Sequence, residues 1–294
     1  MVLPESLTQR QKVALKRANR ERLRFKLAAF PWWLVAIGLV IVATIFLISN
    51  DPTFSEAFSI IRVGIGTTLT ITLISYSISL LIGLTTSLAR LSKNIICKNA
   101  ATFYIEVLRG IPMLVSIFFI ALVLVPGAVG GMERIGHWLI AVGLEGIGKS
   151  LTQFEIRDVS MSFRAIVALS ITYGAYSAEI FRAGIQSVHP GQMEAARSQG
   201  MSHGQAMRNV ILPQAIRNVL PAIGNDFIAM LKDSSLVSVL GVRDVTQVAR
   251  LYAGHSFRFT EAYTTLSVLY LTMTLMLSLV VKMIERRISN NEQQ

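Results

Sequence analysis

The sequence predicts an all-α membrane protein with about six transmembrane helices. Of its 294 residues, 52% are hydrophobic and only 15% are charged, whereas ordinary soluble domains carry about 25% charged residues. The hydrophobic residues also stand in blocks, such as 31–50 and 262–281, that are free of charge for about 20 residues, the length of helix that crosses a bilayer. We therefore expect most of this chain to lie in a membrane rather than in water.

Six segments are the candidate spans. The first lies behind about 30 polar residues and lacks a small-residue cleavage site, so we interpret it as a retained helix rather than a signal peptide. The fourth is weak, because its uncharged stretch of about 14 residues also suits a buried helix. The fifth contains Asp226, Lys232 and Asp233, and ionisable residues inside spans usually face a bundle interior or an aqueous cavity. The predicted spans are 31–49, 63–89, 111–132, 164–182, 215–240 and 262–281.

The distribution of positive charge predicts the orientation. Placing both termini in the cytoplasm puts about 18 Lys and Arg on that side and about 8 on the other, as the positive-inside rule expects. The basic tail, 1–30, then lies in the cytoplasm, either solvated or resting on anionic lipid. The polar tail 286–294 lies on the same side. No repeat period or low-complexity linker divides the chain, so we expect one membrane domain.

Composition and motifs exclude several function classes. The net charge of +11 does not indicate nucleic-acid binding, because no RNA- or DNA-binding motif accompanies it. The single cysteine, Cys97, permits no intrachain disulfide and no paired-cysteine metal cluster. The four histidines lack metal-ligand spacing, and no nucleophile and base can be paired. We therefore predict no metal site, no catalytic residue and no enzyme activity.

Residues 143–150 imitate a nucleotide site. They match the phosphate-loop pattern G-x-x-x-x-G-K-S, and the apolar residues before them imitate the strand that such a loop requires. Only about 30 residues separate the third and fourth spans, which is too few for a parallel sheet. The charge distribution also places this segment outside the cell. We interpret its glycines as turns beside a short surface helix.

The loop 189–213, HPGQMEAARSQGMSHGQAMRNVILP, carries the strongest functional signal. Gly200 suits a left-handed cap at the end of one short helix. Ser202, with Gln205 three residues later, matches a capping box at the start of a second helix, and Pro213 interrupts the helix that follows. Two short helices that project into the cytoplasm form a docking surface. The alternative is an ordinary amphipathic loop in which Glu194 is a solvated charge.

This loop resembles the cytoplasmic loop of the permease subunits of ABC importers, whose pattern is Glu-Ala-Ala, three residues, Gly, nine residues and Ile-x-Leu-Pro. The resemblance implies that the loop, hereafter the coupling loop, fits into a cleft of an ATPase subunit and transmits nucleotide-driven motion. Small alanines let its first helix sit deep in that cleft, and the glycine sets the angle between the two helices. The matching residues are Glu194, Ala195, Ala196, Gly200, Val210, Leu212 and Pro213, with Val210 replacing the usual Ile.

Three further segments, 106–112, 176–184 and 232–238, resemble the polar amino-acid branch of that family, which includes histidine, glutamine and arginine permeases. With the coupling loop, the resemblance covers about residues 60–285. It implies a five-helix permease core over 60–285, to which the span 31–49 is an extra N-terminal helix. The external segment 126–160 is longer than this branch usually has.

The resemblance implies a permease subunit that carries amino acids into the cell through a bacterial plasma (inner) membrane. ATP and Mg²⁺ would bind to a partner ATPase dimer, and no cofactor to this chain. The other implied partners are a second permease subunit (this chain or a paralogue), an extracytoplasmic solute-binding protein and membrane lipid, but no nucleic acid. The alternative is a secondary transporter or channel for small polar solutes, which would not need the Glu-Ala-Ala loop.

An amino acid carries an ammonium and a carboxylate, so its pathway needs compensating groups. Arg109 suits the carboxylate and Glu179 suits an ammonium. Structural pairing of Glu179 with Arg182, and of Lys232 with Asp233, is the alternative. The hydroxyls of the second span, Thr68, Thr70, Thr72, Ser75, Ser77 and Ser79, are explained better by helix packing. The remaining pathway candidates are Tyr173, Lys232, Asp233, Ser234 and Ser235.

Overall fold

The computed structural model describes residues 32–290, and within that range it contains helices and no strand, which confirms the all-α class. The predicted basic tail, 1–30, lies outside the described residues. The α-helices are α2 (Trp32–Asn50), α3 (Pro52–Ile61), α4 (Ile65–Arg90), α5 (Ile95–Gly110), α6 (Met113–Phe119), α7 (Val125–Ala141), α8 (Glu145–Thr152), α9 (Met161–Ser187), α10 (Pro190–Ser198), α11 (His203–Ala206), α12 (Leu212–Asp233), α13 (Val245–Ser256) and α14 (Phe259–Asn290). Short 3-10 segments, η1 (Arg62–Gly64), η3 (Ile156–Asp158) and η5 (Ser234–Leu240), and π-helical segments, η2 (Ile120–Leu124) and η4 (Met207–Ile211), connect them.

Three helical stretches of the described chain are long and apolar enough to cross a membrane: Pro52–Arg90, Met113–Ala141 and Phe259–Glu285. They contain most of the predicted second, third and sixth spans. The shorter apolar helix Val35–Asn50 corresponds to the first. The fourth and fifth predicted spans, α9 and α12, do not meet this criterion. These two helices pack against each other and against α4. Polar residues of α9 such as Arg164, Ser170 and Ser177 are buried inside the bundle, whereas Asn218 and Lys232 of α12 are exposed.

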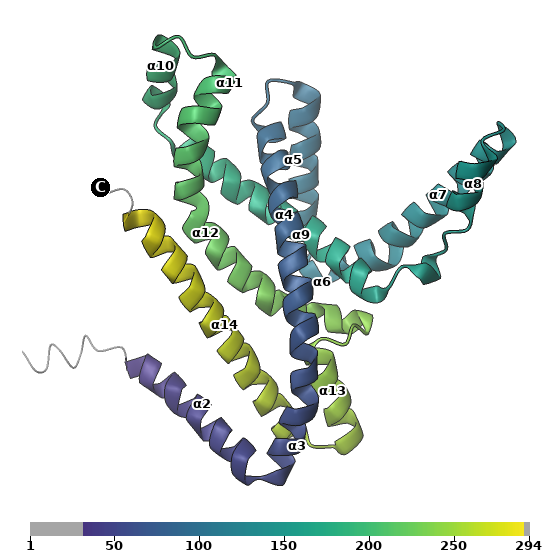
Figure 1. Ribbon diagram of the computed structural model, residues 1–294, viewed down its shortest axis with the longest axis vertical. Helices are drawn as coiled ribbons and strands as arrows, with labels where there is room; N and C mark the ends of the chain where they lie inside the picture. The colour runs from purple at the N-terminus through teal and green to yellow at the C-terminus, as the bar shows by residue number, and fades with distance from the viewer. Residues whose placement is uncertain (1–31, 291–294) are drawn as a thin grey trace, which may run out of the picture.

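Helix α9 is the centre of the bundle. It lies along α4 and also contacts α5, α6 and α12 (Figure 1). The approach of α4 is close, because a Cβ atom on Gly83 would lie 2.6 Å from the Ser177 Cβ. Helix α9 is longer than the predicted span 164–182. Arg164, the first residue of that predicted span, is buried, and its guanidinium donates to the carbonyls of Ile156 and Val159 at 2.7 and 3.1 Å.

The hydroxyl residues of α4 divide between two faces. Thr70 and Ser77 are exposed, whereas Thr68, Thr72, Ser75 and Ser79 are buried. Three of the buried hydroxyls donate to carbonyls three or four residues earlier in the chain; Thr72, for example, donates to the Thr68 carbonyl at 2.7 Å. The buried face therefore serves the packing of α4, as hydroxyls commonly do in membrane helices.

Two π-helical segments precede prolines. Segment η2 ends two residues before Pro126, and η4 ends two residues before Pro213. Proline has no N–H group and clashes with the carbonyl four residues earlier, and a widened turn accommodates both effects. The predicted interruption at Pro213 therefore takes the form of a π turn, and the helical path continues from α11 into α12.

The end of the molecule opposite the coupling loop is built from α3, α13 and the start of α14 (Figure 1). Residues Ala57, Ile61, Val245 and Ala249 form its apolar centre. The Arg258 guanidinium binds the Glu56 carboxylate at 2.6 Å and joins the turn before α14 to α3. At the N-terminus of α3, the Asp51 carboxylate accepts hydrogen bonds from the Thr53 hydroxyl and amide, which hold its pKa below the usual value.

Helices α7 and α8 form a hairpin that projects from the bundle (Figure 1). They approach closely at two glycines, because a Cβ on Gly148 would lie 2.7 Å from the Gly136 carbonyl oxygen. The segment 143–150 follows helix α7 rather than a strand, with a left-handed turn at Gly143 (φ +89°). Its Lys149 pairs with Glu145 at 2.7 Å on the surface. The phosphate-loop pattern is thus a turn and a short surface helix, as the sequence predicted.

Candidate functional site

The coupling loop forms two short helices, α10 and α11, at one end of the molecule (Figure 1). Gly200 ends the first with φ +84°, a left-handed conformation that glycine adopts without a Cβ clash. The Met201 amide then donates to the Ala196 carbonyl at 3.2 Å. Ser202 and Gln205 exchange the two hydrogen bonds of a capping box, at 3.3 and 2.8 Å. The local cap geometry that the sequence predicted is confirmed.

The outer and inner faces of this loop have different chemistry. Glu194 and Ala195 are exposed on α10, whereas Ala196 is only 5% exposed and faces the chain itself. Beneath the loop, Ile185, Val188, Ile211 and Ala215 form an apolar cluster. Leu91, Met193, Met207, Val210 and Leu212 pack against this cluster. Val210 and Leu212 therefore hold the loop in place from below, and the exposed face of α10 is left open for a partner.

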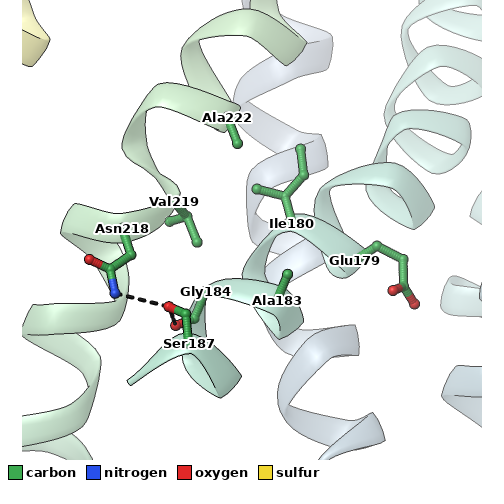
Figure 2. Close-up of a pocket in the computed structure, with 8 residues that line it drawn as sticks. All are labelled: Glu179, Ile180, Ala183, Gly184, Ser187, Asn218, Val219 and Ala222. Carbon is green, nitrogen blue, oxygen red and sulfur yellow. Dashed lines mark hydrogen bonds between the residues drawn. The ribbon is translucent and has the colours of Figure 1, made fainter. Parts of the chain in front are cut away.

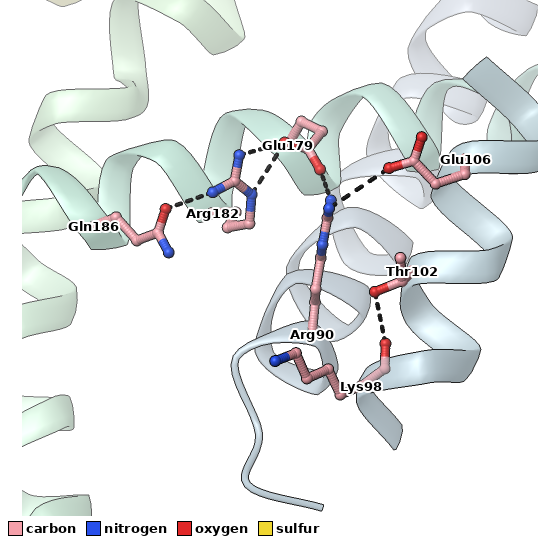
Figure 3. A network of polar contacts seen from close by, with 7 residues as sticks. All are labelled: Arg90, Lys98, Thr102, Glu106, Glu179, Arg182 and Gln186. Carbon is pink, nitrogen blue, oxygen red and sulfur yellow. Dashed lines mark hydrogen bonds and ion pairs between the residues drawn. The ribbon is translucent and has the colours of Figure 1, made fainter. Parts of the chain in front are cut away.

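A charge network joins α4, α5 and α9 (Figure 3). The Glu179 carboxylate accepts two hydrogen bonds from the Arg182 guanidinium, at 2.7 and 3.0 Å, and pairs through its other oxygen with Arg90 of α4. Arg90 also lies 3.6 Å from Glu106 of α5, and Arg182 donates to Gln186. Both oxygens of Glu179 are thus occupied. The expected structural pair with Arg182 is present, and the partner Arg90 lies 89 residues away.

A pocket of about 490 Å³ is lined by residues of α9 and α12 on the side of the coupling loop (Figure 2). The Asn218 amide donates to the Ser187 hydroxyl at 2.9 Å across it. The Glu179 side chain lies at the far edge from these two residues, turned away from them in Figure 2. The lining residues are Glu179, Ile180, Ala183, Gly184, Ser187, Asn218, Val219 and Ala222.

Two carboxylates of α12 face the bundle interior. Tyr173 of α9 donates to the Asp233 carboxylate at 2.7 Å, and Ser177 donates to Asp226 at 3.3 Å. Among the described residues, no cation forms an ion pair with either carboxylate within 4.0 Å, and Lys232 is exposed. Carboxylates held inside a bundle by hydroxyl groups alone are typical of functional sites in membrane proteins.

Arg109 lies at the other end of the same row of side chains. Its guanidinium stands over the Tyr176 ring, 5.8 Å from the ring centroid, and the Tyr176 and Tyr173 rings are 5.9 Å apart. The row Arg109, Tyr176, Tyr173 and Asp233 therefore connects α5 through α9 to the end of α12. Ser234 donates locally, to the Leu231 carbonyl three residues earlier, at 2.8 Å, and Ser235 beside it is half-buried.

The sequence reasoning did not select Asp226, Ser177, Tyr176 and Arg90 as site residues. Asp226 had a signal, because an acidic residue inside a predicted span is expected to face the interior. Tyr176 and Ser177 lie inside the segment 176–184 that resembles the amino-acid branch, but the sequence alone does not distinguish them from the other tyrosines and serines of the spans. Arg90 ends a span and is indistinguishable in sequence from the other cytoplasmic arginines.

A family model described as the inner membrane component of binding-protein-dependent transport systems matches residues 79–290. The chain is 33% identical over 244 residues to the probable amino-acid permease protein YxeN of Bacillus subtilis (strain 168), covering 83% of this chain and 95% of that protein. It is 34% identical over 224 residues to the glutamine transport system permease protein GlnP of Escherichia coli (strain K12), covering 76% and 90%. The crystal structure of an amino acid ABC transporter with histidines matches at a TM-score of 0.62 and 37% identity, covering 83% and 97%.

Proposed function

Because this chain belongs to the family of inner membrane components of binding-protein-dependent transport systems, we propose that it carries amino acids when a separate ATPase engages the coupling loop. The chain is the permease subunit of an amino-acid importer of the ABC class. A permease of this class implies an ATPase and a substrate-binding protein as partners. The observation that supports engagement by the ATPase is the exposed face of α10, around Glu194 and Ala195, between helix ends fixed by Gly200 and by the capping box of α11.

The ATPase binds the outer face of α10, around Glu194 and Ala195. The apolar cluster below the loop packs α10 and α11 against the ends of α9 and α12. A displacement of the loop therefore moves α9 and α12. ATP and Mg²⁺ bind to the ATPase dimer and not to this chain. In this proposal the coupling loop and both termini lie in the cytoplasm, and the excess of basic residues predicted for that side supports this orientation.

Two permease subunits face each other across the pathway, either two copies of this chain or one copy and a paralogue. The solute-binding protein delivers the amino acid from outside the cell, at the end built from α3 and α13. Lipid surrounds the remaining surface, including α14, of whose most apolar window only 6% is buried within this chain. One copy alone thus supplies one wall of the pathway.

Within that wall, Asp226 and Asp233 receive the ammonium of the amino acid and Arg109 receives its carboxylate. The two aspartates have only hydroxyl partners, so a cationic group gains a strong interaction there. Glu179 is less suited to this role than the sequence predicted, because Arg90 and Arg182 occupy both of its oxygens. Tyr173 and the Ser234–Ser235 turn position Asp233, and Lys232 lies on the outer side of the same turn.

The test of the function is ATP-driven uptake in proteoliposomes that contain this chain, its ATPase and its solute-binding protein. We expect uptake of an amino acid that requires all three components and stops when ATP is withheld. Uptake by the chain alone at the same rate would instead indicate a channel or a secondary transporter, and would contradict the proposal. Binding of the ATPase to the chain in detergent provides an independent measurement.

Replacing Asp233 with Asn should lower uptake at low external amino acid about tenfold or more, because a hydrogen bond to a charged group contributes roughly 1.5–3 kcal/mol. The uptake rate is measured against amino-acid concentration in the same proteoliposomes. Glu133→Gln is the matched control, since Glu133 is exposed on the projecting α7. Unchanged uptake by the Asp233 variant would remove this aspartate from the pathway.

A further inference from the structure

Helix α4 is connected to the coupling loop through two adjacent residues at its end. Arg90 is the last residue of α4, and Leu91 is its C-cap. Neither lies in the coupling loop, in α9 or in α12. We propose that Arg90 and Leu91 form a joint through which the coupling loop moves α4 together with α9 and α12; this proposal rests on the proposed function.

The apolar half of the joint is Leu91. Its side chain packs against the cluster of Ile185, Val188, Ile211 and Ala215, which supports the coupling loop from below. Close-packed side chains transmit displacement because they have little free volume to absorb it. A shift of the loop therefore pushes on the turn between α4 and α5.

The charged half of the joint is Arg90. Figure 3 shows its guanidinium between Glu179 and Glu106, with Glu179 held from the other side by Arg182. The side chains of Arg90 and Glu179 are only 21% and 18% exposed, so water screens their attraction less than on an open surface. Glu179 is eight residues from the end of α9, immediately before the coupling loop. The pair therefore fixes the end of α4 to the part of α9 that the loop moves.

Helix α4 connects this joint to the interior site. It runs without interruption from Ile65 to Arg90, and the fourteen residue steps from Tyr76 to Arg90 span about 21 Å of helix. The Tyr76 hydroxyl donates to the Ile223 carbonyl of α12 at 2.5 Å, and its ring stacks on Phe227 at 4.7 Å. These contacts flank Asp226. A movement that begins at the coupling loop thus reaches Asp226 along α4 as well as along α12.

The experiment compares Arg90→Gln, Glu179→Gln and the double variant in proteoliposomes with the ATPase and the solute-binding protein. We expect each single variant to lower the amount of amino acid taken up per ATP hydrolysed roughly fivefold, the lower end of coupling effects between sites. The double variant should lose no more than either single variant, because both remove the same pair. Arg90→Lys, which keeps the charge, should restore at least part of the ratio.

The surface pair of Glu145 and Lys149 supplies the control, because Lys149→Gln removes an ion pair of the projecting hairpin without touching the bundle. It should leave the ratio unchanged. Thermal unfolding and ATPase binding of each variant separate transmission from folding. If Arg90→Gln does not assemble, Leu91→Ala tests the apolar half by the same ratio. Full coupling in assembled Arg90 and Leu91 variants overturns the joint, whereas loss of ATP dependence in the unaltered transporter overturns the proposed function itself.

Discussion

Replacing Gly200 with valine should abolish most amino-acid uptake while the permease still reaches the membrane and binds lipid normally. Gly200 has φ +84°, and a left-handed conformation costs an ordinary L-residue roughly 1–2 kcal/mol, with a larger penalty for a β-branched side chain. The turn between α10 and α11 would relax toward another angle. The ATPase would then meet α10 in the wrong orientation, and its hydrolysis would proceed without uptake.

Gly204→Val is the matched control for this experiment. Gly204 lies four residues further along in α11, and added Cβ atoms at both glycines meet no neighbour within 4 Å. The two variants therefore differ in backbone conformation rather than in crowding. Uptake per ATP hydrolysed is the measurement. Equal losses at both positions, or no loss at Gly200, would contradict the view that the angle between the two helices matters.

Replacing Gly64 with alanine should strongly reduce the yield of folded permease. A Cβ atom there would lie 2.5 Å from both the Cα and the backbone nitrogen of Val245, and backbone atoms cannot rotate away. Helix α13 would have to separate from α4, which also stretches the hydrogen bond from the Val245 amide to the Thr68 hydroxyl, now 3.0 Å. Overpacking of this kind typically costs about 1–3 kcal/mol.

The control for crowding is Gly66→Ala, two residues along in the first turn of α4, where an added Cβ meets nothing within 4 Å. Alanine favours a helix over glycine by about 1 kcal/mol, so this variant should be neutral or slightly more stable. Thermal unfolding in detergent, followed by size-exclusion chromatography, measures both. A Gly64→Ala protein as stable as the unaltered chain would show that α13 is not fixed to α4 at this point.

The features that the sequence predicted correctly depend on residues that are close together in the sequence. The all-α class follows from hydrophobic block length, and the cap at Gly200 and the capping box at Ser202 depend on residues within one or two turns. The coupling loop could be located for the same reason, because its pattern lies within about 20 consecutive residues.

The sequence could not predict contacts between distant segments. Tyr173 and Asp233 are separated by 60 residues, and Arg90 and Glu179 by 89, so nothing local pairs them. The predicted third span, 111–132, ended before Glu133 and Arg134, but the helical stretch continues to Ala141. Charged residues such as Glu and Arg end a hydrophobic block without ending a helix.

The widened turn η4 has one consequence for how this region tolerates change in chain length. A π turn contains about one residue more than an α turn, and each residue advances a helix by about 100°. Inserting a residue would rotate α11 and everything before it by that amount. Deleting one from Met207–Ile211 would convert the π turn to an α turn and return Pro213 to a clash with the carbonyl four residues earlier. Insertions and deletions in this segment should therefore be far more harmful than most single substitutions there.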